Sequence, residues 1–163
     1  MKWNMGCGND KQEGYINTDT DLNLDVLPYP FPNNHFDEIL AKNVMEHLTL
    51  DTDQLMKELH RILKPGGVLR IRVPHYTNPA SHYTQHKKEF SSKSFDGYMS
   101  YNAYNRRCYP FGFIKLEKVI DFPKGLMFWN HIIEWLANIN ILHYETTPLN
   151  ILPAKGMWFE LIK

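Results

Sequence analysis

The sequence has little cysteine. Cys7 and Cys108 are its two cysteines, too few for the disulfide framework that stabilises small secreted domains. A reducing compartment is therefore the expected environment. The chain also lacks a run of about 18 apolar residues and an N-terminal pattern of basic then apolar residues, so we expect no membrane span and no signal peptide. These absences predict a cytoplasmic protein.

An excess of charge of either sign is also missing. Lys and Arg number 18, Asp and Glu number 18, and the formal net charge is zero. A dedicated nucleic-acid-binding protein should present a basic face, so nucleic acid is disfavoured as a partner and a small molecule is favoured. Apolar residues make up 43% of the 163 residues, enough to form a buried core. We predict a single domain over residues 1–163.

Two glycines mark the first motif, in the stretch K-W-N-M-G-C-G at residues 2–8. Residues 3–5 fit a short buried strand. Gly6 and Gly8 on either side of Cys7 fit a turn that a ligand can approach closely, because glycine has no Cβ atom to block it. A strand that ends in such a turn is typical of a nucleotide-type site in an open α/β sheet, although G-x-G also occurs in ordinary tight turns.

The remaining patterns alternate between strand and helix, which predicts an α/β fold. Residues 51–63 fit a helix, because apolar side chains recur at helical spacing after a cap-rich start and Lys64-Pro65-Gly66-Gly67 follows as a stop. Strands are expected at residues 3–5, 15–17, 22–27, 36–41, 68–73, within 113–122 and at 158–163. Right-handed crossovers then give a Rossmann-like, seven-stranded, mostly parallel sheet with flanking helices.

Two insertions interrupt this alternation, at residues 74–110 and 123–155. The first is polar and aromatic and follows a central strand, where ligand loops lie in open α/β sheets, so we assign it to substrate binding. The second contains a helix candidate at residues 126–142 whose apolar residues cover much of its circumference. Core packing is the expected role of that helix, and a homodimer face or an apolar substrate wall are the alternatives.

Three histidines lie within twelve residues of the first insertion: His75, His82 and His86. Imidazole titrates near neutral pH, so each is a candidate catalytic base. Substrate contact without proton transfer, and a solvated polar loop, are the alternatives. No cysteine or paired carboxylate lies at ligand spacing beside them, so no metal site is predicted.

Four pieces of the sequence occur in an order that resembles one enzyme family. They are W-N-M-G-C-G at 3–8, Y-I-N-T-D at 15–19, P-F-P-N-N-H-F-D-E-I-L-A-K-N-V-M-E-H-L at 30–48, and L-H-R-I-L-K-P-G-G-V-L-R-I at 59–71. The ordered set resembles the class I S-adenosylmethionine-dependent methyltransferases, particularly small ones with a short first crossover. The resemblance covers about the first half of the chain. It implies S-adenosyl-L-methionine as cofactor and an antiparallel last strand.

The same resemblance implies roles for individual residues. The glycine turn would approach the methionine part of the cofactor, and Asp19, with Asp21 in reserve, would accept hydrogen bonds from the ribose hydroxyls. Asp25 and the backbone N–H of Val26 would lie near adenine, and His47 would form the floor of the site. Cofactor contacts are thus predicted at Asn4, Gly6, Cys7, Gly8, Asp19, Asp25, Val26, Asn43, Val44 and His47.

Some positions depart from the family pattern. Asn4 stands where these families often have an acid, and Asn9 and Asp10 follow Gly8 where a third glycine is common. We also expect no helix before the first strand, where many members of the family have one. We expect a methyltransferase with a small-molecule acceptor. The alternatives are a non-catalytic Rossmann-like binding module and, less favoured because G-x-G-x-x-G is incomplete, a nicotinamide-dependent oxidoreductase.

Overall fold

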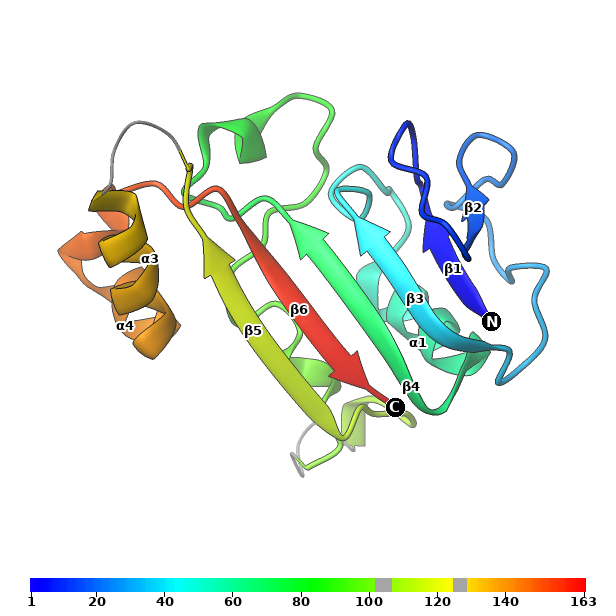
Figure 1. Ribbon diagram of the computed structural model, residues 1–163. Helices are drawn as coiled ribbons and strands as arrows, with labels where there is room; N and C mark the ends of the chain where they lie inside the picture. The colour runs from blue at the N-terminus through cyan, green and yellow to red at the C-terminus, as the bar shows by residue number, and fades with distance from the viewer. Residues whose placement is uncertain (102–106, 125–128) are drawn as a thin grey trace.

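The computed structural model describes residues 1–101, 107–124 and 129–163 and shows one mixed sheet with helices against it (Figure 1). Six strands are ordered β2-β1-β3-β4-β6-β5. Neighbours up to β4 are parallel, and β6 runs antiparallel to both β4 and β5. The strands are β1 Lys2–Met5, β2 Ile16–Thr18, β3 Phe36–Lys42, β4 Leu63–Val73, β5 Lys115–Asp121 and β6 Gly156–Ile162. The predicted α/β class and antiparallel last strand are confirmed.

The helices are α1 Thr52–Ile62, α3 Trp129–Ile139 and α4 Ile141–Thr146, with short 3₁₀ turns η1 Pro79–His82, η2 Asp96–Tyr98 and η3 Pro148–Ile151. Helix α1 matches its prediction. The Asp51 side chain caps its start by accepting a hydrogen bond from the Gln54 N–H at 3.1 Å. Its apolar face is fully buried at Leu55, Met56, Leu59 and Ile62. At the other end, the Lys163 ammonium donates to the carbonyls of His60 and Leu63.

The sheet has six strands in the described part of the chain, where seven were predicted, because residues 22–27 form turns and no strand. The Asn23 side chain accepts a hydrogen bond from the Asp25 N–H at 3.0 Å, which bends the backbone out of an extended path. Leu24 is buried, and Leu22 and Leu27 pack against the core. The alternating leucines therefore anchor a loop, and their spacing imitates that of a strand.

The first crossover, residues 6–15, contains no helix. Two side-chain amides hold it instead. Asn4, which is 2% exposed, donates from its amide nitrogen to the Asp10 carbonyl at 2.8 Å and to Asn17 Oδ1 at 2.9 Å. Asn17 in turn accepts from the Gln12 N–H and donates to the Gln12 and Tyr15 carbonyls. These bonds satisfy backbone groups that a helix would otherwise pair internally.

The two faces of the sheet differ in polarity. On one face, which α1 covers, alternate residues of β3 and β4 such as Ile39 and Leu69 are fully buried. On the other face, a row of ion pairs crosses the strands: Glu38 contacts Lys2 and Arg70, and Arg70 contacts Glu160. The V-L-R-I-R-V pattern of β4 is explained by this difference, because a sheet buried on both faces has nearly continuous apolar strands.

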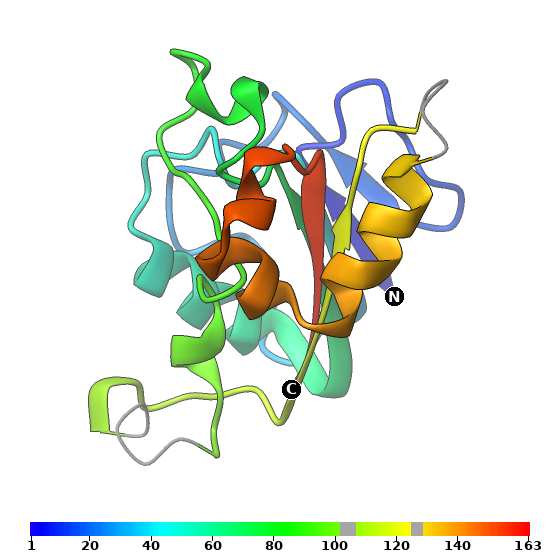
Figure 2. The ribbon, with the colours of Figure 1, turned by 90° about the vertical axis from the view of Figure 1, so that its left-hand side faces the viewer.

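Helices α3 and α4 lie beyond the edge strand β5 (Figures 1 and 2). The α3 side chains bond to that edge: Asn138 pairs with the N–H and the carbonyl of Ile120 at 2.9 and 2.8 Å, and Glu134 accepts from the Phe122 N–H at 3.0 Å. Core packing was the expected role of this helix, and that expectation is wrong for most of it. Ala137 is its one buried residue among those described, whereas Trp135 is 66% exposed.

The helix predicted at residues 126–142 is divided at Asn140, whose side chain accepts from the His143 N–H and caps α4. Residues 126–128 of that prediction lie outside the described residues, as do 102–106 of the first insertion. No helix in the described ranges is both long and apolar enough to cross a membrane.

Candidate functional site

The glycine turn lies where three parallel strands end together. Met5 at the end of β1 pairs with Thr18 of β2 and with Ala41 of β3. The residues that follow each strand, including Gly6 and Asp19, therefore meet at one edge of the sheet. In open α/β sheets the carboxyl ends of the strands form the ligand-binding edge.

The turn is shaped by close contact with the segment after β3. Gly6 has φ +61°, and a Cβ atom at this position would lie 2.3 Å from Cγ2 of Val44. Gly8 also has a positive φ, +48°, but has open space around it, with nothing within 4 Å of such an atom. Gly6 therefore fits against the protein itself, and Gly8 leaves room for a ligand. Cys7 between them is buried, and its N–H donates to the Thr18 carbonyl at 2.9 Å.

Two carboxylates, those of Asp19 and Asp21, follow β2, and they differ in whether they hydrogen-bond within the protein. Asp21 Oδ1 accepts a hydrogen bond from the Asp19 N–H at 2.6 Å and so closes the turn. The Asp19 carboxylate is exposed and has no partner among the described residues. An acid at this place is suited to accept hydrogen bonds from two neighbouring hydroxyl groups, as in nucleotide sites of this fold class.

Asp25 and Val26 are placed differently. One oxygen of Asp25 accepts the N–H groups of Thr49 and Leu50, both at 2.8 Å, so this carboxylate joins the loop after β2 to the segment before α1. The Val26 side chain is 58% exposed, and its N–H donates to the Asn23 carbonyl at 3.3 Å. The Asp25 carboxylate thus has a structural use in the protein itself.

Asn43 begins the segment after β3 in the left-handed conformation, with φ +52°. Its side-chain oxygen accepts a hydrogen bond from Arg72 at 2.9 Å, and Arg72 also contacts Asp121 at 3.0 Å. This chain of contacts fixes the backbone that brings Val44 against Gly6. The buried Asn4 amide serves the crossover loop, as described above, so its nitrogen is engaged within the protein.

The structure separates the three candidate histidines. His75 is 0% exposed, and its ring nitrogens contact Thr77 Oγ1 at 2.7 Å and Glu145 Oε1 at 3.0 Å. Burial alone would raise the pKa of Glu145, but hydrogen bonds from His75 and Ser92 outweigh it and lower that pKa. This arrangement supports a structural role for His75, which joins the first insertion to α4.

His82 and His86 are accessible by comparison. His82 Nδ1 contacts Glu89 Oε1 at 2.8 Å, and both side chains are more than half exposed. The His86 ring lies against the His47 ring with centroids 4.7 Å apart. The segment that carries them rises beside the carboxyl ends of β3 and β4 (Figure 1), and the Lys87 N–H anchors it by donating to the Glu46 carbonyl at 2.6 Å.

Glu46 is a residue to which the sequence analysis gave no role. It is 1% exposed, and burial raises its pKa to about 7. One of its carboxylate oxygens has no hydrogen-bond partner in the described part of the protein. In the sequence, Glu46 could have been noticed only because it directly precedes His47, just after a strand end. Its burial could not be predicted, because it depends on contacts with residues distant in sequence.

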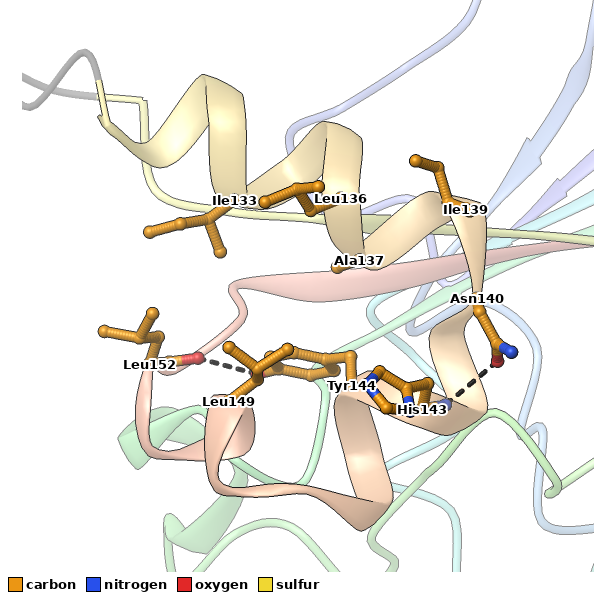
Figure 3. Close-up of a pocket in the computed structure, with 9 residues that line it drawn as sticks. All are labelled: Ile133, Leu136, Ala137, Ile139, Asn140, His143, Tyr144, Leu149 and Leu152. Carbon is orange, nitrogen blue, oxygen red and sulfur yellow. Dashed lines mark hydrogen bonds between the residues drawn. The ribbon is translucent and has the colours of Figure 1, made fainter.

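An apolar cavity of about 310 Å³ lies at the other side of the molecule, between α3, α4 and η3 (Figure 3). Ile133 on α3 points toward Leu149 and Leu152, and Tyr144 forms part of the floor. Strands β3, β4 and β6 separate the edge strand β5 beside this cavity from β1 and its glycine turn. The cavity is therefore separate from the nucleotide-type site.

Known proteins resemble the chain in sequence and in fold. A family model described as "Methyltransferase domain" matches residues 4–71. The ubiquinone/menaquinone biosynthesis C-methyltransferase UbiE of Shewanella frigidimarina is 30% identical over 88 residues, 54% of this chain and 31% of that protein. UbiE of Pseudoalteromonas translucida is 36% identical over 77 residues, 47% of this chain and 26% of that protein. The match thus spans less than a third of these relatives' length.

Solved structures extend the likeness to the whole fold. A SAM-dependent methyltransferase of Archaeoglobus fulgidus superposes with a TM-score of 0.60 at 12% identity, over 99% of this chain and 85% of that one. An S-adenosylmethionine-dependent methyltransferase of Mesorhizobium loti gives 0.52 at 11% identity, over 99% and 90%. The predicted resemblance to class I S-adenosylmethionine-dependent methyltransferases is confirmed. The family model matches the sequence of residues 4–71, and the likeness of fold covers 99% of the chain.

Proposed function

We propose that this protein is an S-adenosylmethionine-dependent methyltransferase that acts on a small-molecule acceptor. The observation that carries the proposal is that the glycine turn and the Asp19 carboxylate, which has no partner among the described residues, meet at one edge of the sheet. Open backbone at Gly8 and an acceptor of hydroxyl hydrogen bonds on the next strand are what an adenosyl ligand requires.

Each residue then has a physical task toward the cofactor, which supplies the activated methyl group. The Asp19 carboxylate accepts hydrogen bonds from both ribose hydroxyls. The turn at Gly6 and Gly8 gives the methionine part room beside Val44, and Asn43 holds that wall in place through Arg72. The protein accelerates the transfer mainly by orienting the two reactants and excluding water.

Asp25 contributes indirectly to this site. Because its carboxylate already accepts two backbone N–H groups, it positions the loop at residues 22–27. Val26 lies on that loop, and its exposed side chain is available for contact with an adenine ring. Asn4 and Cys7 also contribute indirectly. The Asn4 amide and the Cys7 N–H fix the glycine turn by donating hydrogen bonds to the carbonyls of Asp10 and Thr18.

The acceptor site is proposed beside the segment 81–89, which lies next to the strand ends. If the acceptor must lose a proton, His82 is the best-placed base of the three histidines. Its Nδ1 is oriented by Glu89, which leaves Nε2 to receive a proton. His75 has both nitrogens occupied, and His86 faces His47.

Calorimetric titration with S-adenosylmethionine, S-adenosylhomocysteine and NAD tests the proposal. We expect the two sulfur compounds to bind and NAD to fail. Asp19→Asn should weaken that binding at least 10-fold, because a carboxylate acceptor is lost. Glu13→Gln, which removes an exposed charge from the neighbouring loop, is the matched control and should bind normally.

A screen of acceptors for released S-adenosylhomocysteine then tests turnover. Binding of NAD alone would replace the proposal with the nicotinamide-dependent oxidoreductase. Binding of the sulfur compounds without turnover on any acceptor would favour the non-catalytic module, for which the engaged Asn4 and Asp25 side chains are the supporting observation.

A further inference from the structure

Three potential metal ligands meet between the segment after β3 and the first insertion. Glu46, His47 and His86 each present one ligand atom, and these atoms all lie within 4.8 Å of one another. His47 follows Glu46 directly in the chain, whereas His86 comes from the insertion. The cluster therefore depends on the tertiary fold.

We propose that Glu46, His47 and His86 bind a divalent transition-metal ion, with zinc as the reference ion. Two imidazoles and one carboxylate are an established ligand combination for zinc with a fourth position left for water or another oxygen. The same donor set also suits ferrous iron and related ions. None of these three residues belongs to the glycine turn. Metal binding at this site does not require the proposed methyl transfer.

The Glu46 carboxylate is the first independent support. Its residue is 1% exposed, and its Oε2 has no partner in the described ranges. A buried oxygen that makes no hydrogen bond costs about 1 to 3 kcal/mol. A cation bound to Oε2 would remove that cost. Burial also raises the pKa of Glu46 to about 7, because it outweighs the lowering effects of the backbone and of the Arg72 charge.

The orientation of the two imidazoles is the second support. His86 Nδ1 lies 3.2 Å from the Ser81 carbonyl oxygen. A carbonyl can only accept, so Nδ1 carries the proton and Nε2 has its lone pair available. The Gln85 backbone in the same segment acts on the His47 ring, where it opposes the lowering of the His47 pKa by burial. A ligating histidine almost always donates its other N–H to such an acceptor.

The surroundings hold the cluster close to its bound geometry. The Lys87 N–H donates to the Glu46 carbonyl at 2.6 Å, and the Lys88 ammonium donates to the Leu50 carbonyl at 2.5 Å. These bonds fix the insertion against the ligand segment. Ligand atoms around tetrahedral zinc are roughly 3.4 Å apart, as follows from bond lengths near 2.0 to 2.1 Å. The exposed His47 and the half-buried His86 need only small movements to close to that spacing.

The direct test is metal titration of the full chain, prepared without a polyhistidine tag and treated with a chelator. We expect one Zn²⁺ to bind per chain. Co²⁺ should give visible absorption bands of a four- or five-coordinate site with nitrogen ligands. Glu46→Gln, His47→Ala and His86→Ala should each weaken Zn²⁺ binding at least 10-fold.

His131→Ala is the matched control, because His131 is an exposed histidine on α3 away from the cluster. It should bind Zn²⁺ like the unaltered protein. Glu46→Gln keeps the shape of the side chain and His47 is exposed, so these two variants remain informative if another fails to fold. Absence of saturable binding, or equal loss in His131→Ala, would overturn the proposal.

A second experiment separates this site from the proposed function. Asp19→Asn should lose affinity for S-adenosylhomocysteine and retain Zn²⁺, and Glu46→Gln should lose Zn²⁺ and retain affinity for S-adenosylhomocysteine. Coupled loss of both ligands in both variants would contradict two separate sites. A protein that binds Zn²⁺ but no adenosyl compound would retain the metal site and refute the methyltransferase.

Discussion

Gly6 and Val44 are in such close contact that no side chain fits between them. A Cβ atom on residue 6 would lie 2.3 Å from Cγ2 and 2.9 Å from Cβ of Val44. This contact joins the first strand's turn to the segment after β3, two pieces of chain almost forty residues apart. Two of the four pieces that carry the family resemblance are thus a single packed unit.

Gly6→Ala should therefore destabilise the protein more than Gly8→Ala. Both positions have positive φ, +61° and +48°, so alanine costs about 1 to 2 kcal/mol of strain at either. Only at position 6 is overpacking against Val44 added, about 1 to 3 kcal/mol more. Urea denaturation of both variants measures the difference. The double variant Gly6→Ala/Val44→Ala should recover part of the loss, and no recovery would contradict the steric explanation.

Asp25→Ala should reduce stability by about 1 to 3 kcal/mol, because the N–H groups of Thr49 and Leu50 lose their acceptor. Asp25→Asn keeps an oxygen at the same place and should cost clearly less. Hydrogen exchange at residues 49 and 50 gives a direct readout, with faster exchange expected in the alanine variant. Equal stability of the two variants would show that these bonds contribute little.

The His60 side chain should contribute a loss of stability as pH decreases from about 6.5 toward 4. Its pKa is lowered to about 4, chiefly by burial and further by the Lys163 charge, against a weaker opposing effect of the Gly112 backbone. The unfolded chain therefore takes up a proton in this range while the folded protein does not. The loss should be about 1 kcal/mol, since water still screens part of the ring.

His60→Gln should show a smaller loss of stability over the same pH range. His131→Gln is its control, because that histidine is exposed, and it should follow the unaltered protein. Denaturant melts at several pH values give both comparisons. A pH dependence that His60→Gln leaves unchanged would refute the assignment.

His75 and His82 should respond to substitution in opposite ways. His75→Gln should lower stability by about 2 to 3 kcal/mol, because Glu145 and Thr77 lose their hydrogen bonds to the buried ring. His82→Ala should change stability by less than about 0.5 kcal/mol. If the acceptor requires proton removal, His82→Ala should lower kcat about 100-fold. Measurement of stability and kcat on both variants separates the two roles.

The sequence predicted those parts of the fold that depend on local periodicity. The apolar face of α1 was assigned correctly, because Leu55, Leu59 and Ile62 recur at helical spacing and pack as that spacing requires. The strand prediction at residues 22–27 was wrong because Leu24 is buried as part of a loop, and period-2 spacing does not distinguish a strand from such a loop. The prediction of core packing for α3 was wrong at the exposed Trp135 for a related reason, since apolar character alone does not ensure burial.

Sequence reasoning reached the residues of the candidate site but not their partners. His75 and His82 look alike in the sequence, and the difference lies in Glu145, 70 residues from His75. The engagement of Asp25 by Thr49 and Leu50 is equally non-local. Asp19 could be selected because its role requires only a position at a strand end.

The margins of the sheet have a consequence for the protein in concentrated solution. An exposed edge strand offers its unpaired backbone groups as a template for another chain. On β5, the Asn138 amide occupies the N–H and the carbonyl of Ile120, and directly after the strand Glu134 occupies the N–H of Phe122. At the opposite margin, β2 is three residues long. The Asn138 amide, the Glu134 carboxylate and the shortness of β2 thus reduce the template that this small sheet offers for fibril growth.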